Sequence, residues 1–183
     1  MPSRARPQTL VTLEFDDAQA SQAIAFPLLD ERGLRATVFV NSDRLDRPGY
    51  LSRRQVHDLH AAGQEIGGHG LGHEDLRKLN RAALARAVVD DRAALRGAGF
   101  PCVSFAYPCG WLNDTVKQAV RDAGYASARV IHGLSDTTTL VPPARGGVAG
   151  GVLRVADRAA TRPICHAHRG ARHALDDGGR PPA

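Results

Sequence analysis

The sequence predicts a single α/β domain in which parallel strands alternate with helices. Three observations lead to this prediction. Apolar runs of strand length recur along the chain, and helix-like segments that end at glycine lie between them. The length of 183 residues is that of one domain with its own core. Strands and helices that alternate four or five times are typical of parallel βα units.

The first strand is expected at residues 10–15, LVTLEF, and it leads directly into Asp16 and Asp17. A run this apolar is usually covered on both faces of a sheet. A helix-like pattern follows over residues 18–32, interrupted by Pro27. The next strand is expected at residues 36–40, ATVFV, where β-branched and aromatic residues again indicate burial on both faces.

The middle of the chain repeats this order. Ser52 is a plausible N-cap for a helix over residues 53–62, and a short third strand is expected at residues 65–66. A glycine-rich turn then carries two histidines, His69 and His73. The clearest helix is the alanine-rich segment 80–96, which two glycines terminate.

The last regular units precede residue 135. A fourth strand is expected at residues 103–107, then a helix capped by Asn113, then a fifth strand at residues 125–131. Residues 138–141 and 151–155 are candidates for short strands. The domain prediction is an N-terminal extension over residues 1–9, a folded domain over residues 10–160 and a disordered basic tail over residues 161–183.

The charge of the chain is concentrated near its end. The net charge is +5, and residues 145–183 hold seven Arg and three Asp, so 7 − 3 = +4 of it lies there and +1 elsewhere. A tail of this kind is weak evidence for a polyanion partner, so no specific nucleic acid is expected. No oligomeric state is indicated.

The start of the chain lacks the pattern of a secretory signal. The basic residues at the beginning are followed by one strand-like run and not by an apolar segment with a cleavage site, and no run is long enough to span a membrane. We therefore expect a cytoplasmic protein without membrane contact, with secretion as the alternative if the start is truncated.

Functional groups of parallel βα folds lie at the carboxyl ends of the strands. Asp16 and Asp17 follow the first strand, and His69 and His73 follow the third. Two His and one carboxylate form the ligand set of an open hydrolytic zinc site. Taken singly, the acids also suit a helix cap and the histidines a core or surface position, so both interpretations stay open at this stage.

Three ordered motifs resemble a known family. The segments EFDDA, GGHGLGH followed by EDL, and FAYPCG are similar to the first three motifs of the polysaccharide deacetylases, carbohydrate esterase family 4, with the NodB-homology fold. The resemblance covers residues 10–129. It implies a distorted (β/α) barrel and metal-dependent hydrolysis of acetyl groups from an N-acetylated or O-acetylated sugar or glycan.

The resemblance also implies roles for single residues. Asp17, His69 and His73 would bind a divalent metal, with Zn²⁺ preferred and Co²⁺, Mn²⁺ or Ni²⁺ as alternatives. Asp16 would be the general base that deprotonates the metal-bound water. A site in which both carboxylates bind the metal is the competing geometry.

The third motif would supply the substrate side of the site. The backbone N–H of Cys109, with Tyr107 and Pro108 beside it, would stabilise the oxyanion. Trp111 either stacks on a sugar ring or packs within the fold.

The chain departs from the family pattern in three places. Gly70 replaces a Ser or Thr that can brace the loop, and Ala106 replaces an Arg that orients the catalytic base. The general acid should be a His on a late apolar strand, for which His166, preceded by Ile164 and Cys165, is the match and His168 the alternative.

The apolar run before His166 is short, so other interpretations stay open. Cys165, His166 and His168 could form a second metal site, or the segment could be unstructured. A truncated or altered C-terminus would leave the barrel incomplete. Three rival functions remain: a hydrolase of another small soluble amide on the same fold, a non-catalytic glycan- or metal-binding relative, and polyanion binding through the Arg-rich tail.

Overall fold

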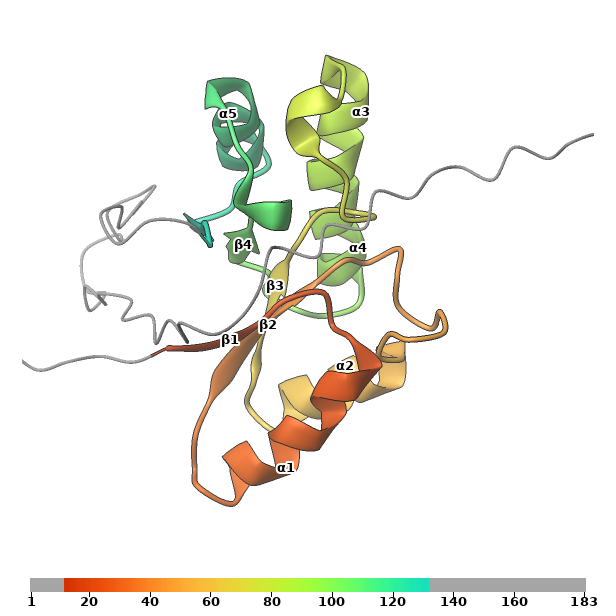
Figure 1. Ribbon diagram of the computed structural model, residues 1–183, viewed down its shortest axis with the longest axis vertical. Helices are drawn as coiled ribbons and strands as arrows, with labels where there is room; N and C mark the ends of the chain where they lie inside the picture. The colour runs from red at the N-terminus through yellow and green to blue at the C-terminus, as the bar shows by residue number, and fades with distance from the viewer. Residues whose placement is uncertain (1–11, 132–183) are drawn as a thin grey trace, which may run out of the picture.

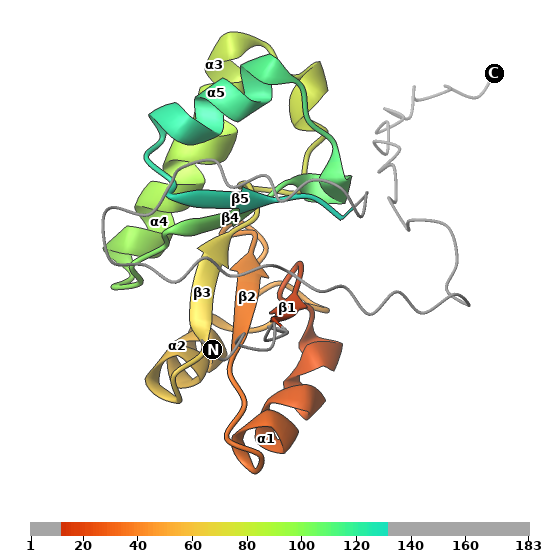
Figure 2. The ribbon, with the colours of Figure 1, turned by 90° about the vertical axis from the view of Figure 1, so that its left-hand side faces the viewer.

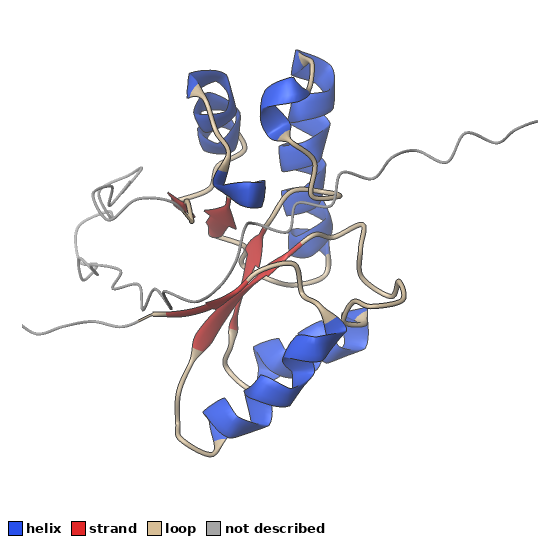
Figure 3. Ribbon diagram, viewed as in Figure 1, coloured by secondary structure: helices blue, strands red, loops and turns tan. Residues whose placement is uncertain are grey.

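The computed structural model describes residues 12–131, which form one parallel sheet with helices packed against it (Figures 1 and 3). The sheet has five strands in the order β1-β2-β3-β4-β5. Its strands are β1 (Leu13–Phe15), β2 (Ala36–Val40), β3 (Glu65–Gly68), β4 (Ser104–Ala106) and β5 (Ser127–Arg129).

The connections between strands are helical. The α-helices are α1 (Ala25–Asp30), α2 (Arg53–Ala61), α3 (Arg81–Ala85), α4 (Asp91–Gly97) and α5 (Asp114–Asp122). A π-helical turn, η3 (Arg86–Asp90), joins α3 to α4, so these three segments form one continuous helical stretch. Short 3₁₀ helices are η1 (Ala20–Ile24), η2 (Leu76–Lys78) and η4 (Pro108–Gly110).

The strand order decides the architecture. All neighbouring strands are parallel and follow one another in sequence, without the reversal of order that marks a doubly wound sheet. Crossovers between parallel strands are right-handed as a rule, which places the helices on one face, and here the helices lie around the outer side of the curled sheet. Figure 2 shows this curl, because β4 and β5 run in a different direction from β1, β2 and β3. The described part is a curled half-barrel, as expected for a distorted (β/α) barrel.

The register separates the two faces of the sheet. Phe15, Val38 and Ile66 are aligned across neighbouring strands and face the helices, where the hydrophobic core lies. The opposite, inner face carries Glu14, which lies beside Thr37, and Arg129, which lies beside Ala106. The inner face of the curled sheet is therefore more polar than its helix-covered face.

Most predicted elements are present, with changes at their ends. The strand at residues 36–40 is confirmed in full, whereas the strand at residues 125–131 is shortened to β5. The helical segment 18–32 is split into η1 and α1, with Pro27 inside the first turns of α1, where a missing N–H costs little. The candidate strands at 138–141 and 151–155 lie outside the described residues, as do both predicted domain boundaries.

Within residues 12–131, no helix has the length and apolar character that crossing a membrane requires.

Candidate metal and active site

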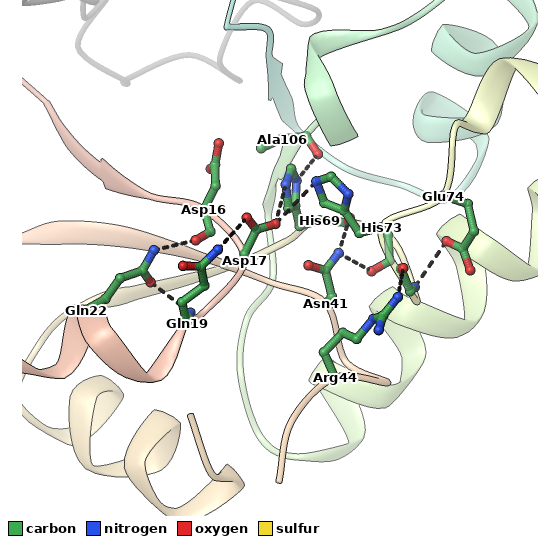
Figure 4. A network of polar contacts seen from close by, with 12 residues as sticks. Asp16, Asp17, Gln19, Gln22, Asn41, Arg44, His69, His73, Glu74 and Ala106 are labelled. Atoms are coloured by element: carbon green, nitrogen blue, oxygen red, sulfur yellow. Dashed lines mark hydrogen bonds and ion pairs between the residues drawn. The ribbon is translucent and has the colours of Figure 1, made fainter. Parts of the chain in front are cut away.

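Three side chains predicted from the sequence meet at the carboxyl end of the sheet (Figure 4). The Asp17 Oδ1 atom lies 3.4 Å from His69 Nε2 and 3.3 Å from His73 Nε2. One ligand atom from each of the three residues lies within 4.8 Å of the other two. His69 is buried, while Asp17 and His73 keep 28% and 27% of their side chains exposed. The cluster is therefore partly open to solvent.

The turn after β1 directs Asp17 towards the histidines. Asp17 has φ 71° and Ala18 has φ 52°, so the chain leaves the strand through two left-handed residues. Gln22 donates a hydrogen bond to the Asp16 carbonyl oxygen at 2.6 Å, which fixes this turn. The Gln19 amide lies 3.4 Å from Asp17 Oδ2. Asp17 is thus held by its second oxygen, and Oδ1 faces the two imidazoles.

The ring of His69 is fixed from its other side. Its Nδ1 lies 2.7 Å from the Ala106 carbonyl oxygen. A carbonyl oxygen can only accept, so Nδ1 carries a proton and the Nε2 atom faces Asp17. A histidine that binds metal through one nitrogen commonly donates its other N–H in this way.

The loop that follows β3 is braced without a hydroxyl at position 70. The Asn41 amide donates to the carbonyl oxygens of His69, at 2.5 Å, and Gly70, at 2.9 Å. The Leu71 N–H donates to the Ala87 carbonyl oxygen in η3 at 2.9 Å. His73 ends the loop with φ 63°. These contacts hold the start of the loop that carries both histidines, without a Ser or Thr at position 70.

Electrostatics divide the two histidines. Burial opposes a charge on His69, but its hydrogen bond to Asp17 and the charges of Asp16 and Asp17 outweigh burial and raise the pKa of His69. Burial and the charge of His69 lower the pKa of His73. Burial opposes ionisation of Asp17 too, yet the hydrogen bond and charge of His69 outweigh it and lower its pKa. The cluster therefore favours one positive charge beside an ionised Asp17.

The donor set fits a divalent metal ion. With Nδ1 of His69 protonated, its Nε2 and the Asp17 Oδ1 atom are two electron-pair donors that face each other, and only a proton or a cation between them relieves their repulsion. His73 contributes a third such donor. Two imidazoles and one carboxylate are a set that zinc prefers in open sites.

Asp16 points away from the cluster, as Figure 4 shows. Its carboxylate forms an ion pair with Arg129 of β5 instead. The two neighbouring acids therefore point in different directions, and Asp16 is paired with a guanidinium although position 106 is Ala. Arg129, Asn41 and Gln19 were not among the residues predicted from the sequence. The position of Asn41 directly after β2 could have indicated a site residue, whereas nothing in the sequence around β5 indicated Arg129.

The third motif lies at the same end of the sheet, where it begins in β4 and continues into η4. Cys109 has φ 55° within η4, so the chain turns sharply there. Tyr107 is 1% exposed, and its ring packs edge-on against Phe105, so its side chain belongs to the core. Trp111 is half-buried, and the Arg77 guanidinium lies 4.6 Å from its ring centroid. The candidate general acids His166 and His168, and Cys165, lie outside the described residues.

Comparisons with known proteins agree with this geometry. The sequence profile of the family described as polysaccharide deacetylase matches residues 3–128. No curated protein matches the sequence. Among solved structures, the Streptococcus pyogenes deacetylase PplD, in complex with acetate, is similar at a TM-score of 0.62 and 23% identity, over 68% of this chain and 57% of that one.

Two further solved structures have a similar fold. The family 4 carbohydrate esterase from Streptomyces lividans, in complex with acetate, has a TM-score of 0.58 and 24% identity, over 66% of this chain and 62% of that one. A mutant of BA3943, a CE4 family pseudoenzyme with restored enzymatic activity, has a TM-score of 0.59 and 19% identity, over 67% and 44% of the two chains.

The chain thus matches less than two thirds of the length of these relatives. At these identities the structures establish the fold, and the family rests on the match over residues 3–128, more than half of the chain. With the three motifs, the curled parallel sheet and this match in agreement, the chain belongs to the polysaccharide deacetylase family.

Proposed function

We propose that this protein is a metal-dependent deacetylase that hydrolyses an acetyl group from an N-acetylated or O-acetylated sugar or glycan. The observation that carries the proposal is the placement of Asp17 Oδ1 at 3.3–3.4 Å from two imidazole nitrogens, in a chain of this family. Asp17, His69 and His73 would hold the ion, for which Zn²⁺ is the first candidate. When bound, such an ion polarises an acyl carbonyl and lowers the pKa of water.

The residues of the chain divide the remaining work. Asp16 is the proposed general base, because its carboxylate lies next to the cluster in sequence but is turned away from it. It would take a proton from the attacking water as the carbonyl carbon becomes tetrahedral. The Cys109 backbone N–H is the proposed donor to the developing oxyanion. The bond to the sugar nitrogen or oxygen then breaks, that atom takes a proton from a general acid, for which His166 is the candidate from the sequence, and acetate leaves.

Metal content tests the proposal first. We expect the purified full chain to hold about one zinc per molecule, as a site of this donor set does, and Asp17→Ala and His73→Ala to lose it. Because both substitutions remove a ligand, acetate release should fall by about 100-fold or more. Inductively coupled plasma mass spectrometry measures the metal, and a coupled assay measures acetate from chitooligosaccharides and from small N-acetyl sugars.

The outcomes separate the rival functions. Release from small N-acetyl compounds alone would favour a hydrolase of small amides. Zinc bound in full with no release from any acetylated substrate would favour a binding relative. Variants that keep their zinc would contradict the proposed ligand set.

A further inference from the structure

Arg129 joins two strands that lie at opposite edges of the sheet. Its Nε atom lies 2.5 Å from Glu14 Oε2, an ion-pair contact, and its Nη2 atom is paired with Asp16 Oδ1. The three side chains are largely buried, with 18% of Arg129, 21% of Glu14 and 28% of Asp16 exposed. One guanidinium in β5 thus holds the Glu14 carboxylate of β1 and the carboxylate of Asp16, which follows β1 and is 113 residues away in sequence.

The sheet itself directs Arg129 to this place. Arg129 is aligned with Ala106, and Glu14 lies on the same inner face. Gly67 leaves room for the Phe39 ring, since a Cβ there would lie 2.7 Å from it, and the Arg129 guanidinium lies 4.6 Å from the centroid of that ring. The buried Phe39 ring supports the flat face of the guanidinium, while its edges meet the acids.

This contact decides which way Asp16 faces. Asp16 and Asp17 are adjacent, so a free Asp16 carboxylate could turn towards the two histidines and become a second acidic ligand. The ion pair with Arg129 holds the Asp16 Oδ1 atom on the other side (Figure 4 shows this direction). Glu14 holds the guanidinium from a second direction, so Arg129 is itself fixed.

We infer that Arg129 is a positioning residue, which orients Asp16 as the general base and keeps it out of the metal site. This inference rests on the proposed function. A purely structural role, in which Arg129 only ties β5 to β1, predicts different effects of its removal. In that case stability, zinc affinity and turnover would decline together.

Substitution of Arg129 separates the two roles. For Arg129→Met we expect kcat to fall by about 10–100-fold, as misplacement of a base does, with KM changed less than about threefold. Zinc affinity, measured by competition with a chelator, should stay the same or rise, because a released Asp16 can join the ion. Arg129→Lys should restore part of kcat, since it keeps the charge but not the planar fork that meets two carboxylates.

Arg53→Met is the matched control. Arg53 also pairs with an aspartate, Asp46 at 3.1 Å, but on the exposed surface of the fold. Its kcat, KM and zinc affinity should equal those of the wild type. Unchanged kcat in Arg129→Met, or a parallel loss of kcat and zinc affinity, would overturn the positioning role.

A second measurement does not depend on activity. In metal-free full-length protein, the losses of melting temperature caused by Arg129→Met and Asp16→Asn should not add, because both break one ion pair. Additive losses would overturn the inference even if no substrate were turned over. A wild type that is inactive with every metal and substrate would instead contradict the proposed function. The comparison of melting temperatures would still test the ion pair between Arg129 and Asp16 in that case.

Discussion

At the residue scale, the candidate site depends on backbone conformations that side chains usually disfavour. Asp17, His73 and Cys109 all have positive φ, at 71°, 63° and 55°. Such conformations cost about 1–3 kcal/mol each and persist only where surrounding contacts enforce them. Gln19 and Gln22 provide those contacts for the first turn. Three predicted site residues therefore have strained backbone conformations, which lower the stability of the fold and orient a polar group of each residue.

Asp91 is the most deeply buried acid of the described part. It is fully buried, and its Oδ1 accepts the Ser42 N–H at 3.0 Å, while its Oδ2 has no hydrogen-bond partner among the described residues. Burial raises the pKa of Asp91 from 3.8 to about 6. The folded state therefore favours the protonated form. Protonated Asp91 contributes its full stabilisation of the fold below about pH 4. This stabilisation is lost as the pH rises from about 4 to about 6, and the free energy of unfolding has no further dependence on Asp91 above that.

Asp91→Asn should remove this pH dependence. A shift of this size corresponds to about 3 kcal/mol of the free energy of unfolding at most, since one unit is about 1.4 kcal/mol. The variant should gain stability relative to the wild type between pH 4 and pH 6, because its amide stays neutral at every pH. Urea unfolding at several pH values measures the difference. Asp122→Asn, an exposed position of α5, is the control, and an identical pH profile in Asp91→Asn and wild type would refute the prediction.

At the element scale, the loop after β3 is held by a residue that follows β2 and by a helical turn that comes later in the same β3–β4 connection. Asn41 comes directly after β2, and Ala87 belongs to the π-helical turn η3. The sequence pattern predicted the helix over residues 80–96 but not this π-helical turn within it. Its position next to the histidine loop matches the frequent occurrence of such turns at functional sites.

Local patterns could be predicted from the sequence, whereas contacts between distant strands could not. The strand at residues 36–40 and the meeting of Asp17 with His69 and His73 follow from local pattern and from the topology of parallel strands. The ion pair of Asp16 with Arg129 does not, since it depends on how strongly the sheet curls and which residues face inward. Contacts between distant strands lack a local pattern that would reveal them.

Asn41→Ala tests the loop brace. The substitution leaves the carbonyl oxygens of His69 and Gly70 without their donor, which should cost about 1–3 kcal/mol of stability. Because the loop carries both histidines, zinc affinity should fall by about 10–100-fold, as for other residues that support metal ligands. Asn80→Ala is the matched control, since it removes the N-cap of α3 at a cost of about 1 kcal/mol. Equal zinc affinity in both variants would contradict the brace.

At the scale of the whole molecule, the site brings together residues that follow strands which are not hydrogen-bonded neighbours in the sheet. Asp17 follows β1, His69 and His73 follow β3, and β2 lies between these strands. Arg129 ties β5 to β1 in addition. A metal ion in the cluster would therefore act as a cross-link between separate strands, and its binding should stabilise the fold as well as the site.

Thermal unfolding with and without zinc measures this coupling. A ligand at 100 times its dissociation constant adds about 2.7 kcal/mol to the free energy of unfolding, which corresponds to a rise in melting temperature of about 5–10 °C for a chain of this length. Mg²⁺ should give a smaller rise, because it prefers oxygen ligands to imidazole. Asp17→Asn should lose most of the zinc-dependent rise, whereas Asp122→Asn should keep it. If zinc raised the melting temperature of Asp17→Asn as much as that of the wild type, the ion would bind elsewhere, and Asp17, His69 and His73 would not be its ligands.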